Sequence, residues 1–246
     1  MSRNEKFYNN YSIKQYFVDI ARHKSINFIN FLNTIEQNFI IDSINDTTSN
    51  VLVIGMGYGR EIDIVKKIKP NIKIHALDFN KQFINWGKNN YKNVLFELYD
   101  LNSKNVAFNF EKYDLIICFN TLEYLENINA INLIYKIGKN LKKNSVFLFR
   151  IPSDNFIQKK YVNYLLSKRS SLEPITTSFD IDIIYRHLIK NNFNVTLFKQ
   201  PIKFEGFFAN FLYSKLWNFF SYLESLIRFF MPYRNCRAIY FKCYKK

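Results

Sequence analysis

Residues 51–59 read Val-Leu-Val-Ile-Gly-Met-Gly-Tyr-Gly, and this stretch decides the fold class. Four apolar residues that end at Gly55 are typical of a buried parallel strand. Glycines at 55, 57 and 59 let the backbone turn tightly and approach a ligand that a Cβ atom would repel. Residues 60–69 continue with apolar side chains at helical spacing and stop before Pro70. The stretch therefore predicts a strand, a glycine turn and a helix, the order that a nucleotide-binding crevice requires.

Apolar runs alternate with helical patterns along the rest of the chain. We predict strands at 51–55, 72–77, 94–99, 113–118, 145–150, 194–199 and 237–244. We predict helices at 60–69, 80–91, 127–142 and 180–191, after one or two helices within 12–41. Strands separated by helices form a parallel sheet that is covered on both faces. The expected fold is therefore α/β, with a Rossmann-like, seven-stranded, mostly parallel sheet flanked by helices.

A single domain accounts for the whole chain, because 246 residues with 48% hydrophobic content suffice for one large core. Its expected parts are an N-terminal helical cap at 1–47 and a cofactor-binding core at 48–200. An aromatic helical insert at 201–234 precedes the last strand at 235–246.

Polar residues follow three successive predicted strands. Asp78 closes the second strand, Asp100 follows the third and Asn120 follows the fourth. The carboxyl ends of parallel strands meet at one edge of a sheet, where ligands of such folds bind. An acid about twenty residues after the glycine turn suits the diol of a ribose. The sequence thus predicts a ligand site at this edge.

Together these residues resemble the motifs of class I S-adenosylmethionine-dependent methyltransferases. The resemblance covers about residues 48–200 and is to the small-molecule type, similar to the methyltransferase domain groups 11, 12 and 25. It implies S-adenosylmethionine as the cofactor, with Gly55, Gly57 and Gly59 around its methionine and ribose parts. A dinucleotide site would instead place a third glycine where Arg60 stands.

The same resemblance implies roles for the residues at the other strand ends. It gives Asp78 the ribose hydroxyls and places Phe79 beside the adenine. Asp100, with Leu101, would accept a hydrogen bond from the adenine amino group, and Asn120 would lie in the loop beneath the reactive methyl group. Two ionised carboxylates match these donors, because hydrogen bonds to charged acceptors are worth about 1.5–3 kcal/mol each.

The chain departs from the family pattern at several positions. Val53 stands where many members carry an acid, so Glu61 is expected to receive the amino group of the cofactor, or else to favour the helix dipole. Tyr124 replaces the histidine of a common Glu-His-Leu sequence, and no Asn-Pro-Pro-Tyr follows the fourth strand. For a general base we therefore select Tyr124 and His187, the latter competing with a surface role.

The numbers and spacing of cysteines and histidines give no support to a metal centre. Three cysteines lack Cys-x-x-Cys spacing, and three histidines lack i, i+4 spacing, so we predict no metal. Cys118 lies in an apolar run and is expected in the core.

A net charge of +15 raises the question of a nucleic acid partner. The lysines are scattered along a chain that is rich in Lys, Asn, Ile, Phe and Tyr, which favours compositional bias over a basic binding site. We therefore expect a small-molecule acceptor and not nucleic acid.

The segment at 204–232 carries an apolar helical stripe interrupted by Lys215, Glu224 and Arg228, so it is not expected to span a bilayer. It is interpreted as helices packed on the domain, with a substrate lid or peripheral membrane contact as alternatives. The polar start of the chain and the absence of a long apolar run predict a cytoplasmic protein. The oligomeric state is left open.

These features lead to one functional hypothesis and three alternatives. The hypothesis is methyl transfer to an oxygen of a small or carbohydrate-linked acceptor, nucleotide-activated or phosphorylated, with Arg150 and residues 159–160 as candidate phosphate contacts. The first alternative is a membrane-associated methyltransferase of lipids or quinones. The others are an RNA methyltransferase and an interaction module without catalysis.

Overall fold

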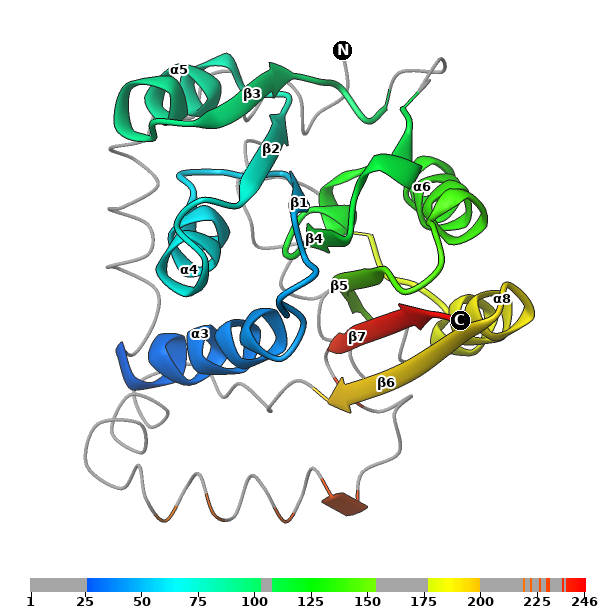
Figure 1. The fold of residues 1–246 in the computed structure, drawn as a ribbon. Helices are drawn as coiled ribbons and strands as arrows, with labels where there is room; N and C mark the ends of the chain where they lie inside the picture. Colours follow the sequence, from blue (N-terminus) through cyan, green and yellow to red (C-terminus); the bar gives the residue numbers. More distant parts are fainter. Residues whose placement is uncertain are drawn as a thin grey trace.

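The computed structural model describes residues 26–102, 108–153, 177–199 and 238–246, together with 219, 222, 226, 229, 230 and 236. One seven-stranded sheet runs through them (Figure 1). Its strands are β1 (Asn50–Ile54), β2 (Lys73–Asp78), β3 (Val94–Leu98), β4 (Leu115–Cys118), β5 (Val146–Pro152), β6 (Phe193–Lys199) and β7 (Ala238–Lys245). The helices are α3 (Ile26–Ile41), α4 (Arg60–Ile68), α5 (Lys81–Asn90), α6 (Asn127–Asn140) and α8 (Ile181–Lys190), with 3-10 turns η1 (Phe110–Lys112) and η2 (Leu122–Tyr124).

The strand order is β3-β2-β1-β4-β5-β7-β6, and every pairing is parallel except those of β7, which is antiparallel to both neighbours. This confirms the predicted seven-stranded, mostly parallel sheet. The chain builds outward from β1 to β3 and then returns to place β4 on the other side of β1. The order of the strands therefore reverses between β1 and β4, which is the position where open α/β sheets bind ligands.

Helices cover both faces of the sheet, as Figure 1 shows. Alternate residues of a strand point to opposite faces, so Leu52 joins the core beneath α6 and α8, and Val53 joins the core beneath α3, α4 and α5. Both cores are apolar. The central strands β1, β4 and β5 accordingly read as nearly continuous hydrophobic runs, because neither of their faces meets water.

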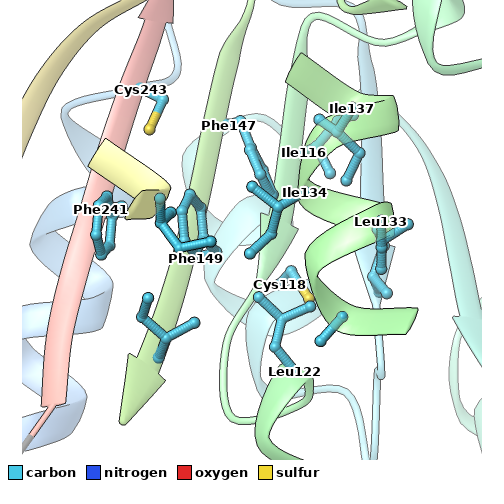
Figure 2. Packing of buried hydrophobic residues seen from close by; sticks show 14 of the residues in the cluster. Ile116, Cys118, Leu122, Leu133, Ile134, Ile137, Phe147, Phe149, Phe241 and Cys243 are labelled. Carbon is cyan, nitrogen blue, oxygen red and sulfur yellow. The ribbon is translucent and has the colours of Figure 1, made fainter. Parts of the chain in front are cut away.

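Aromatic side chains fill the core beneath α6 and α8 (Figure 2). The ring of Phe149 stacks between those of Phe147 and Phe241, with centroids 4.5 Å away on each side. Ile134 of α6 belongs to the same cluster. Cys118 is fully buried there, as predicted. These contacts fix β7 against β5.

Local hydrogen bonds explain several element boundaries. The side chain of Asn80 accepts from the backbone N–H of Gln82 and begins α5 directly after the end of β2. The N–H of Tyr113 bonds the carbonyl of Phe110, so the chain is still in a turn where the sequence predicted the start of β4. Most of the predicted insert at 201–234, and residues 1–25 of the predicted cap, lie outside the described residues.

Candidate functional site

The glycine turn after β1 is held against the end of β2. The N–H groups of Gly55 and Met56 both donate to the carbonyl of Leu77, at 2.8 and 3.1 Å. Gly55, Gly57 and Gly59 have φ angles of 71°, 52° and 91°, which disfavour residues with a Cβ atom. A Cβ on Gly55 would lie 2.0 Å from Oγ1 of Thr121, whereas one on Gly57 would meet no heavy atom within 4 Å. The turn is thus tight at its start and open above Gly57.

Asp78 lies at the end of β2 and bonds to the open part of the turn. Its Oδ2 accepts from the N–H of Gly57 at 3.0 Å, and its Oδ1 accepts from the N–H of Asn80 at 2.9 Å. The residue is only 7% exposed. Burial raises the pKa of Asp78 to about 6, although these backbone N–H groups oppose the shift. Each carboxylate oxygen keeps a further lone pair, which is what two hydroxyls of a diol need.

The next residues predicted to bind the cofactor follow the same edge of the sheet. Phe79, which comes after Asp78, is half-buried. Asp100 is exposed just beyond β3, and its Oδ1 accepts from the N–H of Asn102 at 2.8 Å. Leu101 packs against the core beneath α6. The structure therefore brings the predicted acids to the ends of neighbouring strands, with Asp100 the more accessible of the two to solvent.

Asn120 lies beyond the end of β4 and connects this edge to α3. Its φ angle is 53°, and its Nδ2 donates to Oε1 of Glu36 at 3.2 Å. The hydroxyl of Tyr240 donates to the same oxygen at 3.0 Å. Arg60, at the start of α4, forms an ion pair with Glu36 and another with Glu61. Burial raises the pKa of Glu36, and the guanidinium of Arg60 opposes that shift.

The sequence analysis did not select Glu36. It is the one charged residue of α3, where the other positions are apolar or neutral, and that isolation was the available signal. Glu61, which was selected, is also buried at this edge and shares Arg60 with it. The two carboxylates thus flank one guanidinium beside the glycine turn.

Of the two predicted bases, Tyr124 is the one near this edge. It closes the η2 turn that follows β4 and is half-buried. The neighbouring Glu123 forms a buried ion pair with Arg150, near the end of β5. Because Arg150 is committed to that pair and only 8% exposed, it does not offer the solvent-facing phosphate contact that the sequence suggested.

His187 lies elsewhere in the fold. Its ring stacks on that of Tyr135, with 3.5 Å between centroids, and its Nε2 lies 3.1 Å from Nδ2 of Asn191. It also faces Gly138, near the end of α6, where the chain returns to the start of β5. This is the edge opposite to the glycine turn, so we assign His187 to packing between α6 and α8.

Comparison with known proteins places the glycine turn and its neighbours in a family. Residues 52–147 match the model of a family described as a methyltransferase domain. This part of the chain is a methyltransferase domain. The match runs from β1 to β5 and includes the glycine turn, Asp78, Asp100 and Asn120. No curated protein sequence matches the chain.

Solved structures with the same fold include methyltransferases and a cyclopropane synthase. A S-adenosylmethionine-dependent methyltransferase from Archaeoglobus fulgidus superposes with a TM-score of 0.61 at 14% identity, covering 94% of this chain and 99% of that one. The N-methyltransferase NodS from Bradyrhizobium japonicum, in complex with S-adenosyl-L-homocysteine, gives 0.53 at 12% identity, with 89% and 87% covered. The cyclopropane synthase MmaA2 from Mycobacterium tuberculosis gives 0.59 at 12% identity, with 86% and 84% covered. At these identities the likeness establishes the fold alone.

The carboxyl edge of the sheet, with the glycine turn and Asp78, fits S-adenosylmethionine, the cofactor of this methyltransferase domain. The space above Gly57 is open, so a ligand can lie there, and a Cβ atom at position 57 would contact that ligand. Asp78 can accept from the ribose hydroxyls, and Asp100 is placed to reach the adenine end. Glu36 and Glu61, which share the guanidinium of Arg60, are predicted to attract the ammonium and sulfonium groups. The individual roles of these residues stay predictions.

Cofactor binding should depend on pH through Asp78. Its raised pKa of about 6 means that the folded protein without ligand takes up a proton as the pH falls through 6, which stabilises it relative to higher pH. Hydrogen bonds donated by the ribose hydroxyls favour the ionised form of Asp78 instead. Affinity for S-adenosylmethionine should therefore be constant above about pH 7 and fall by about tenfold per unit below pH 6. Calorimetric titration across this range measures it, and a flat profile in the Asp78→Asn variant assigns the effect.

Proposed function

We propose that this methyltransferase transfers a methyl group to an oxygen of a small or carbohydrate-linked acceptor, nucleotide-activated or phosphorylated. The observation that supports oxygen is the sequence after β4, where Asn120 is followed by Thr-Leu-Glu. The Asn-Pro-Pro-Tyr signature of enzymes that methylate exocyclic nitrogens is absent from this position. Thr121 instead bonds the carbonyl of Ile54 and packs against the glycine turn.

Binding and orientation are the main tasks of this site. When bound, S-adenosylmethionine supplies a methyl group on a positively charged sulfur that is open to in-line attack. Transfer of that methyl requires alignment more than bond polarisation, and a well-oriented pair of reactants can gain about 7–11 kcal/mol from alignment alone. Asp78 and the glycine turn hold one end of the cofactor. Glu36 is held by Arg60, Tyr240 and Asn120, so these contacts fix the position of α3 relative to this edge of the sheet.

An oxygen acceptor also has to lose a proton, and Tyr124 is our candidate to pass it on: its phenol oxygen would accept that proton while its own proton leaves to water. It is half-buried directly after β4, where the acceptor has to approach. Tyr124→Phe keeps the ring and removes the hydroxyl. We propose that this variant binds the cofactor normally and turns over more slowly.

A thermal-shift screen tests the acceptor class. The full chain is heated with S-adenosyl-L-homocysteine and, in parallel arms, with nucleotide sugars, sugar phosphates, quinones or RNA. A ligand that binds only the folded state raises the melting midpoint, because it increases the free energy of unfolding. At a ligand concentration of a hundred times its Kd, that increase is about 2.7 kcal/mol. We expect the largest shift from a nucleotide sugar or sugar phosphate. A shift with RNA or quinone alone contradicts the proposal.

A second candidate function is methylation of a lipid or quinone at a membrane. It is favoured by exposed aromatic side chains after β6, including Phe229 and Phe230, each 78% exposed. No helix among the described residues is both long and apolar enough to cross a bilayer. An acceptor held at a membrane would therefore be reached from its surface.

A further inference from the structure

Five of the six described positions between β6 and β7 carry large apolar side chains that face solvent, and the sixth is the buried Cys236. The five are helical, and they are Phe219, Tyr222, Leu226, Phe229 and Phe230. Their exposed fractions are 64%, 66%, 42%, 78% and 78% respectively. Figure 1 draws these residues in orange and brown along the lower side of the molecule. We call this set the aromatic face.

The spacing of the aromatic face places it on one side of a helix. Successive members are three, four, three and one positions apart. At about 100° per residue, all five directions fall within an arc of about 100°. Four of the five are Phe or Tyr. Water covers this side of the structure, which costs free energy in proportion to the apolar area that it exposes.

The charge of the surrounding sequence indicates what covers this face. Between residues 199 and 237 there are six basic residues and two acidic ones, within a chain of net charge +15. Two such chains repel each other, which disfavours a second copy as the occupant. An aromatic face within a stretch of sequence that is rich in lysine and arginine suits the interface of an anionic bilayer, where rings lie at the headgroup level and basic groups meet anionic lipids.

One hydrogen bond relates the aromatic face to the site. Nζ of Lys199 donates to the carbonyl oxygen of Phe229 at 3.3 Å. Lys199 is the last residue of β6, which runs parallel to β5 because both are antiparallel to β7. The carboxyl end of β6 therefore lies at the same edge of the sheet as the glycine turn and Asp78.

We propose that the aromatic face docks the protein on an anionic lipid surface. Docking there brings the carboxyl edge of the sheet, and with it the cofactor site, toward the membrane. Acceptors attached to lipid then become accessible as well. The docking surface rests on exposed side chains and charge and not on the proposed transfer reaction, so it is measured in the absence of cofactor.

Vesicle flotation of the full chain tests this docking. One set of vesicles is pure phosphatidylcholine, and the other contains about one third phosphatidylglycerol. Wild type should float with the anionic vesicles and much less with the neutral ones. The double variant Phe229→Ser/Phe230→Ser should lower the partition coefficient by about 30-fold, because it removes two rings from the buried interface.

A matched variant separates this face from exposed apolar surface in general. Ile183 and Ile189 of α8 are both 45% exposed, so Ile183→Ser/Ile189→Ser removes comparable side chains elsewhere and should float like wild type. Equal losses in the two double variants, or wild type that stays below both sets of vesicles, overturn the proposal. Equal flotation with both lipids overturns its charge component. If light scattering instead detects a dimer that Phe229→Ser/Phe230→Ser dissociates, the occupant is a second copy and the proposal is wrong.

Discussion

Replacement of Asp78 by alanine is expected to weaken binding of S-adenosylmethionine and S-adenosyl-L-homocysteine by at least about 100-fold. The side chain offers two lone pairs to the ribose, and hydrogen bonds to a charged acceptor contribute about 1.5–3 kcal/mol each. The change also removes the acceptor for the N–H of Gly57, so the open part of the turn loses its support. Isothermal titration calorimetry at about pH 8, where the carboxylate is ionised, measures the loss.

The melting midpoint of the Asp78→Asn variant separates a binding defect from misfolding. Burial raises the pKa of Asp78 because the ionised carboxylate is costly in the free protein. Asp78→Asn removes that charge but also one of the two oxygens that accept backbone N–H groups, so its melting midpoint at about pH 8 should stay close to that of wild type. Asp100→Ala is the matched control at an exposed position, with an expected loss of about tenfold. Unchanged affinity in Asp78→Ala would show that the diol is not bound here.

The sequence alone predicted the sheet because its strands carry unambiguous local signals. Strands buried on both faces are continuous apolar runs, and the turn residues between them interrupt any helical pattern. Gly55 and Asp78 were found for the same reason, since a strand end is visible in sequence. The antiparallel pairing of β7 with β5 depends on contacts such as Phe149 with Phe241, which no local pattern encodes.

The parts of the site that were not predicted depend on contacts between residues that are far apart in the sequence. Glu36 meets Asn120 across 84 positions and Tyr240 across 204, so no spacing rule connects them. His187 was chosen by residue type, but helical periodicity gives the face of a helix and not which edge of the sheet it approaches. Arg150 was expected to bind phosphate, and its partner Glu123 could be identified only in the folded structure.

The largest effect on stability is expected from Gly55→Ala. The new Cβ would lie 2.0 Å from Oγ1, 2.6 Å from Cγ2 and 2.8 Å from Cβ of Thr121, so the backbone of the turn or of residue 121 has to move. Left-handed backbone at a φ of 71° adds strain of about 1–2 kcal/mol for a residue with a Cβ. We expect the free energy of unfolding to fall by about 3 kcal/mol or more, as in other overpacked positions. Urea denaturation measures this change.

Gly57→Ala is the informative partner of that variant, because it makes the same chemical change two residues away. Its Cβ meets no protein atom within 4 Å, so only the strain of a φ of 52° remains, about 1 kcal/mol. The added methyl group occupies the space that the cofactor needs, and affinity for S-adenosyl-L-homocysteine should fall by at least about tenfold while the fold persists. The two glycines thus divide their tasks: the first closes the turn onto Thr121, and the second leaves room for the ligand. A Gly57→Ala protein that binds the cofactor like wild type would place the cofactor away from the turn, whatever the stability of Gly55→Ala.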